Sequence, residues 1–142
     1  MKYHVIGDIH GKIDHMKVLA KNYGNFIFLG DFVDAFDSPI EDQLASLEFA
    51  LELQAEGRAQ IILGNHEIAY THGQACTGNT RAMHAHFDSG LKERLLKVAL
   101  SHVWFEKHKV LISHGGLTNH HWKAQNLHIK TFDEYLKEEF QS

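Results

Sequence analysis

The sequence predicts an α/β fold in which one mainly parallel sheet is flanked by helices. Three short apolar runs, at residues 3–6, 26–29 and 59–63, each stop at a glycine, and segments with helical spacing lie between them. Apolar runs of this length that end at turn residues are typical of buried strands. Because strands that alternate with helices pair in parallel through crossover connections, we expect the three runs to be neighbours in one sheet.

The two crossover segments have the spacing of helices. Within residues 13–21, apolar side chains recur at Ile13, Met16, Val18 and Leu19. A second helix is expected to begin after Pro39, a residue that suits the start of a helix, and its leucines recur at positions 44, 47, 51 and 53.

The later part of the chain predicts further helices and a hairpin. Residues 67–101 read as helical with a loop at 76–79, and the segments 103–106 and 109–113 alternate like two strands joined by a tight turn. The second of these strands ends at Ser113-His114-Gly115-Gly116, as the earlier strands end at glycine.

The chain end predicts one more element and no second domain. An amphipathic helix is expected at 132–140, and no Pro-rich or Gly-rich linker and no repeat precedes it. A chain of 142 residues that is 44% apolar can bury one core, so we expect a single domain over 1–142.

Composition excludes several kinds of partner. The formal charge of −4 provides no general surface for nucleic acid or an anionic membrane, so phosphate would have to bind at a local site. The apolar run near the amino terminus is too short for a signal peptide or a membrane span, and Cys76 is the single cysteine. These features predict a cytoplasmic protein without nucleic-acid or membrane partners, and they leave its oligomeric state open.

Polar side chains follow each predicted strand directly. In open α/β sheets the loops at the carboxyl ends of the strands meet in one crevice, where ligands bind. Each residue alone fits ordinary turn chemistry, but four such clusters together indicate a site. The residues concerned are Asp8 and His10, Asp31 and Asp34, Asn65 and His66, and His114.

These side chains would form an oxygen and nitrogen ligand set for metal ions. A set of two carboxylates, an amide and two imidazoles suits manganese, iron or zinc, and the sequence does not choose among them. Asp31 has two oxygens and could bridge two metals about 3.5–4 Å apart, an arrangement that activates water for phosphate displacement. Two divalent cations would also make the pocket locally attractive to phosphate.

Four short motifs, in order, resemble one enzyme family. GDIHG at 7–11, GDFVD at 30–34, GNHE at 64–67 and SHGGL at 113–117 are similar to the signature of the calcineurin-like metallophosphoesterases. The similarity is greatest to their serine/threonine protein phosphatase and diadenosine tetraphosphate hydrolase branches. It implies the family fold, here a partial four-layer αββα sandwich, and hydrolysis of phosphate esters.

The resemblance also implies the metal ligands. Asp8, His10 and Asp31 would hold a first divalent ion, and Asp31, Asn65 and His114 would hold a second. Manganese is the first candidate, with iron, zinc or nickel as alternatives.

The catalytic roles come from the same resemblance. A metal-bridging hydroxide would attack phosphorus, His66 would protonate the leaving oxygen, and Asp34 would orient His66 through a hydrogen bond. Asn65 would also bind a phosphate oxygen. Glu67 is interpreted as a helix-start carboxylate rather than a ligand.

The sequence departs from the family pattern at two places. Where the family usually has Arg-Gly after the second aspartate of the second motif, this chain has Ala35-Phe36. Arg81 is a candidate for the missing phosphate grip, although a helix-surface charge is the simpler interpretation. The family also has a later metal-binding histidine, for which His120, His121 and His128 are the remaining candidates, so the domain is expected to be short at its carboxyl end.

Two hypotheses of different class follow. The first is a metal-dependent hydrolase whose substrate is a phosphorylated small molecule, a nucleotide such as a dinucleoside polyphosphate, or a phosphoprotein. The second is a non-catalytic metal-binding or protein-interaction member of the same fold, which would bind metal without turnover.

Overall fold

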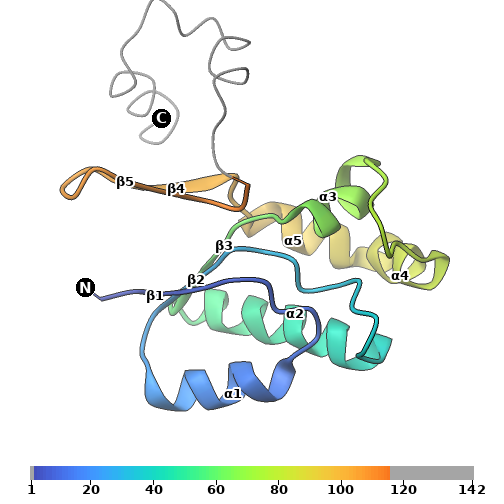
Figure 1. The fold of residues 1–142 in the computed structure, drawn as a ribbon, viewed down its shortest axis with the longest axis horizontal. Helices are drawn as coiled ribbons and strands as arrows, with labels where there is room; N and C mark the ends of the chain where they lie inside the picture. Colours follow the sequence, from blue (N-terminus) through green and yellow to red (C-terminus); the bar gives the residue numbers. More distant parts are fainter. Residues whose placement is uncertain (1, 116–142) are drawn as a thin grey trace, which may run out of the picture.

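The computed structural model describes residues 2–115 and contains the predicted parallel sheet (Figure 1). Its strands β1 (His4–Ile6), β2 (Phe26–Phe28) and β3 (Ala59–Ile61) lie in the order β1-β2-β3, and both pairs are parallel. His4 is opposite Phe26, which in turn is opposite Ala59. The predicted α/β class is confirmed.

The two crossover helices cover one face of this sheet. Helices α1 (Ile13–Asn22) and α2 (Ile40–Ala55) lie side by side below the strands in the view of Figure 1. Phe26 and Phe28 point into the core that these helices share with the sheet, and both are buried. The side chain between them, Ile27, is also buried but packs on the opposite face, as the alternation of a strand requires.

A helical region follows β3 and matches the prediction for residues 67–101 in outline. It contains α3 (Asn65–His72), α4 (Arg81–His86), η1 (Phe87–Leu91) and α5 (Lys92–Val98). The helical path bends within η1, where Gly90 has a φ of 111°. The loop between α3 and α4 includes the predicted loop at 76–79.

The predicted hairpin that precedes His114 is confirmed, and it forms a sheet of its own. β4 (His102–Phe105) and β5 (Val110–Ser113) pair in antiparallel fashion, so β5 is not a fourth strand of the parallel sheet. Pairing between neighbours in sequence is easily formed because the intervening turn is short. Buried Val103 packs with Ile27 and Ile62, so the hairpin covers the face opposite α1 and α2.

Several predicted features lie outside the described residues. These are the helix at 132–140, the end of the SHGGL motif, and the candidate ligands His120, His121 and His128. Within the described part, no helix is both long enough and apolar enough to cross a membrane.

Candidate functional site

The loops that follow β1 and β2 are joined by backbone hydrogen bonds. The N–H groups of Ile9 and His10 both donate to the Asp31 carbonyl, at 3.1 and 2.8 Å, and Gly11 N–H donates to Phe32 O at 3.0 Å. The carboxyl ends of the two strands therefore carry His10 and Asp31 into the same place.

The backbone is strained at three predicted site residues. Among the described residues, the non-glycine positions with positive φ are His10 (43°), Asp31 (58°), Asp34 (65°) and Lys109 (53°). Such a conformation costs on the order of 1–3 kcal/mol for a residue with a side chain and is concentrated at functional sites. The surrounding hydrogen bonds must offset this cost in order to hold the three side chains in place.

The loop that follows β3 approaches so closely that only glycine fits at Gly64. A Cβ there would lie 2.9 Å from Asp31 Cγ and closer still to Asp31 N and Oδ1. On the other side of the contact, a Cβ on Gly30 would lie 2.6 Å from Gly64 Cα. Contacts this short require glycine at both positions.

The buried side chain of Glu67 links the loops that follow β2 and β3 through hydrogen bonds. Its carboxylate is buried and accepts hydrogen bonds from the N–H groups of Asp31 at 2.6 Å, Phe32 at 2.9 Å and Gly64 at 3.2 Å. Burial raises the pKa of Glu67 to about 7, although the three N–H donors act in the opposite direction. The helix-start position expected for Glu67 is observed, and its links to Asp31 and Phe32 are a role that the sequence did not reveal.

Asp31 lies between two groups of possible metal ligands. One group brings together single ligand atoms of Asp8, Asp31 and His114 within 4.8 Å of one another, and the second does the same for His10, Asp31 and His66. His114 Nε2 lies 3.2 Å from Asp31 Oδ2, and His10 Nε2 lies 4.0 Å from it. Asp31 belongs to both groups, and its bridging role stays a prediction. Asp8 and His10 fall into different groups, although His10 Nε2 lies 3.9 Å from Asp8 Oδ2.

Two histidines are oriented as metal-binding histidines are in other proteins. His10 Nδ1 lies 2.8 Å from Val33 O, and His114 Nδ1 lies 2.7 Å from Leu29 O. Because a carbonyl can only accept, each Nδ1 carries the proton, and in a neutral ring Nε2 keeps its lone pair. A backbone carbonyl commonly holds a ligating histidine in this way.

The side-chain amide of Asn65 lies between Asp31 and His114. One of its two polar atoms lies 2.8 Å from His114 Nε2 and 3.0 and 3.2 Å from the two Asp31 carboxylate oxygens. With its nitrogen at this position the amide donates to all three acceptors, and with its oxygen there it would be a metal ligand. An amide oxygen, a carboxylate and an imidazole are ligands that a divalent ion of borderline hardness accepts, so the residues fit a metal site.

His66 and Asp34 form the expected pair. His66 Nδ1 lies 2.9 Å from Asp34 Oδ2, and the Asp34 side chain is only 1% exposed. Tyr70 Oη donates to Asp34 Oδ1 at 2.5 Å, and Asn79 Nδ2 donates to Oδ2 at 2.5 Å. Gln43 Oε1 accepts from Asp34 N–H at 2.8 Å. Asp34 is therefore held on both carboxylate oxygens and on its backbone.

Three of these partners were not anticipated from the sequence. Tyr70, Asn79 and Gln43 are common residue types on helices or loops, and none belongs to a motif. Burial and the hydrogen bond to Asp34 raise the pKa of Tyr70 to about 12. Cys76 also contacts the site, since its Sγ accepts from Asn65 Nδ2 at 3.3 Å and lies 3.6 Å from His66 Nδ1.

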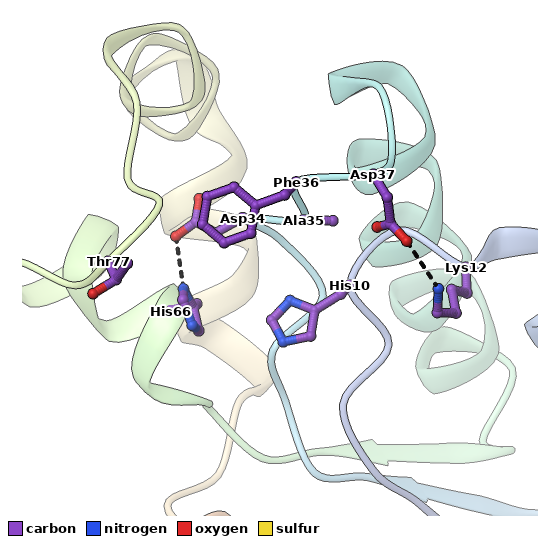
Figure 2. A pocket seen from close by; sticks show the side chains of 8 residues that line it. All are labelled: His10, Lys12, Asp34, Ala35, Phe36, Asp37, His66 and Thr77. Atoms are coloured by element: carbon purple, nitrogen blue, oxygen red, sulfur yellow. Dashed lines mark hydrogen bonds and ion pairs between the residues drawn. The ribbon is translucent and has the colours of Figure 1, made fainter.

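A cavity of about 660 Å³ opens beside His10 and His66 (Figure 2). Lys12, Phe36, Asp37 and Thr77 contribute to its walls. Arg81, the predicted phosphate grip, is exposed at the first turn of α4 and is not among the lining residues, so its role stays a prediction.

Two comparisons relate the chain to known proteins. The sequence model of the calcineurin-like phosphoesterase family matches residues 1–141. A Schizosaccharomyces pombe protein with the provisional description of serine/threonine-protein phosphatase is 36% identical over 77 residues, which are 49% of this chain and 24% of that protein. The match thus spans about a quarter of the length of the curated relative.

Proposed function

The chain belongs to the calcineurin-like phosphoesterase family, and from this premise we propose that it hydrolyses phosphate esters with two divalent cations. The observation that carries the proposal is the position of Asp31 in two groups of possible metal ligands, one with Asp8 and His114 and the other with His10 and His66, each with ligand atoms within 4.8 Å of one another. Carboxylate oxygens and imidazole nitrogens gathered in this way suit divalent cations.

The ligand sets of the proposal follow the motifs. Asp8, His10 and Asp31 would hold one ion, and Asp31, Asn65 and His114 would hold the other. Manganese is the first candidate, with iron, zinc or nickel as alternatives. When bound, such a pair of ions activates water and stabilises the charge on the transferred phosphoryl group.

The protein side chains supply proton transfer and orientation. His66 would donate the Nε2 proton to the leaving oxygen, which neutralises the charge that develops as the phosphorus–oxygen bond breaks. Asp34 accepts from Nδ1 and so fixes the ring plane. Asn65, a neutral amide, would bind a phosphate oxygen without adding negative charge to the site.

The substrate class of the proposal is a phosphomonoester, a phosphoprotein or a dinucleoside polyphosphate, and the location is cytoplasmic. Phosphatase activity is supported by the similarity to the Schizosaccharomyces pombe protein described as a serine/threonine-protein phosphatase, which matches over part of its length.

The proposal is tested by counting bound metal and turnover together. The 142-residue protein would be stripped, titrated with manganese and assayed with an aryl phosphate, beside Asp31→Asn, His66→Asn and, as a control, Val18→Ala on the exposed face of α1. We expect two ions per chain with turnover in the wild type and control, and loss of both ions and activity in Asp31→Asn.

His66→Asn separates a proton donor from a ligand. His66 lies in one of the two ligand groups, but the proposal assigns it to proton transfer. The variant should keep two ions and lose turnover, whereas loss of an ion would make His66 a ligand. Metal binding by the wild type without hydrolysis of any phosphate ester would refute the proposed function in favour of the non-catalytic alternative.

A further inference from the structure

One wall of the cavity beside His66 is uncharged and carries an aromatic ring. The residues of this wall have no role in metal binding or proton transfer in the proposed function. Phe36 lines this cavity together with Ala35 and Thr77. We infer that the cavity is the leaving-group subsite and that it accepts an uncharged aromatic leaving group, namely a phenol. This inference rests on the proposed function, because that function makes His66 the donor to the leaving oxygen.

The position of His66 determines which part of a substrate would enter. A proton donor must lie within hydrogen-bond reach of the leaving oxygen, so the leaving group extends from His66 into the space beside it. His66 and its partner Asp34 both line the cavity. The metal-ligand candidate His10 lines the cavity, whereas Asn65, Asp31 and His114 do not, so the cavity borders the proposed metal centre and a leaving group would extend from it into the cavity.

Phe36 presents its ring to this space. The side chain is 89% exposed, whereas phenyl rings are more often buried. Figure 2 shows the ring among the lining side chains, on the other side of the view from Lys12 and Asp37. The far end of the ring faces the loop between α3 and α4, since a Cβ on Gly78 would lie 3.7 Å from Phe36 Cζ. The ring is therefore placed to stack on a flat, apolar group.

The charges of the walls favour a neutral leaving group. Lys12 is the only lysine or arginine among the described lining residues, and its Nζ lies 3.7 Å from Asp37 Oδ2. The second carboxylate in these walls, Asp34, is paired with His66. Because Lys12 is paired with Asp37, an anionic leaving group such as a nucleotide would find no unpaired lysine or arginine among the described lining residues.

The first test compares leaving groups of equal acidity. The two substrates are phenyl phosphate and a fluorinated alkyl phosphate whose alcohol is as acidic as phenol. Only the first has an aromatic ring, and the two leaving groups depart equally easily. We expect Phe36→Ala to lower the aryl-to-alkyl ratio of kcat/KM by about fivefold to tenfold, the size of one aromatic stacking contact. Val18→Ala, which removes another exposed apolar side chain, should leave the ratio unchanged. An unchanged ratio in Phe36→Ala would overturn the inference.

The second test does not need turnover. The ligands are benzylphosphonate and ethylphosphonate, which have no ester bond to hydrolyse. Each would be titrated calorimetrically into the manganese-loaded protein. The wild type should bind the benzyl compound more tightly, and Phe36→Ala should remove that preference. Equal affinities in the wild type would refute the subsite whatever the turnover. Ring-dependent binding without hydrolysis would support an aromatic site and refute the proposed function.

The source of the phenol is decided by a third comparison. Faster hydrolysis of a phosphotyrosyl peptide than of phenyl phosphate would support the subsite with a peptide source, and the reverse order would support it with a small-molecule source. Faster hydrolysis of the matching phosphoseryl peptide than of both would overturn it. Asp37→Asn should raise the relative rate for anionic leaving groups, because Lys12 would then lack its carboxylate partner.

Discussion

Replacement of Tyr70 by phenylalanine isolates one hydroxyl that supports the His66–Asp34 pair. The Tyr70 ring stacks on Phe87 with a centroid distance of 4.8 Å and contacts the edge of His84 at 4.5 Å. Phenylalanine keeps these ring contacts. The variant loses only the hydrogen bond from Oη to Asp34 Oδ1 and the one that Oη accepts from Thr80 N–H at 3.0 Å.

The expected loss can be worked from these two bonds. A hydrogen bond to a charged group contributes about 1.5–3 kcal/mol, and here the carboxylate left behind is buried. Thr80 is exposed, so water can replace the hydroxyl at its N–H and the second bond adds little. We therefore expect Tyr70→Phe to lower the free energy of unfolding by about 2–3 kcal/mol. Because the pKa of Tyr70 is raised to about 12, the hydroxyl keeps its proton and the loss should not vary across neutral pH.

Two measurements check this reasoning. Urea unfolding followed by circular dichroism should show a lower midpoint with an unchanged slope, which identifies a change in stability alone. Turnover should fall most for phosphate esters with poor leaving groups, which depend on the proton from His66, and least for activated aryl esters. Tyr23→Phe, at an exposed tyrosine, should change stability by less than about 0.5 kcal/mol. A Tyr70→Phe protein as stable and as active as wild type would refute the role assigned to the hydroxyl.

Three further predictions concern glycine, pH and metal. Gly64→Ala should lower the free energy of unfolding by about 1–3 kcal/mol, because the added Cβ would collide with Asp31. Gly24→Ala should have no such effect, because there is open space around Gly24, and thermal unfolding compares the two variants. Burial lowers the pKa of His102 from 6.5 to about 4, so the folded state resists protonation and loses stability as pH falls from 6.5 towards 4. His102→Gln should make stability vary less with pH between 6.5 and 4. An unchanged slope in this range would contradict the role given to His102. Manganese at 100 times its dissociation constant should raise the stability of the wild type by about 2.7 kcal/mol for each ion bound. Chelation should reverse this increase and Asp31→Asn should lack it, and calorimetry with and without chelator measures both.

The close approach of the three loops explains why strained residues occur at this site. His10, Asp31 and Asp34 have positive φ, and each is held by backbone or side-chain hydrogen bonds to a neighbouring loop or helix. Strain of this kind persists only where the surroundings hold the residue in place. The buried Glu67 carboxylate, which binds N–H groups of two loops, is one such support.

The sequence was sufficient for the strands, the crossover helices and the side chains at the strand ends. These features depend on local patterns, since an apolar run that stops at a glycine predicts a strand end whatever the rest of the chain does. The neighbouring positions of Asp8, Asp31 and Asn65 then followed from the rule that parallel strands end at one edge of a sheet.

Only the tertiary structure decided how the remaining groups meet. His114 directly follows the separate antiparallel hairpin. Its Nδ1 nevertheless donates to the carbonyl of Leu29, 85 residues away in the chain. Tyr70 and Asn79 reach Asp34 from 36 and 45 residues away. Tyrosine, asparagine and glutamate are common in helices and loops, so their types carry no signal of these contacts. Whether such a side chain supports the site or faces water depends on how distant segments pack, which no local pattern contains.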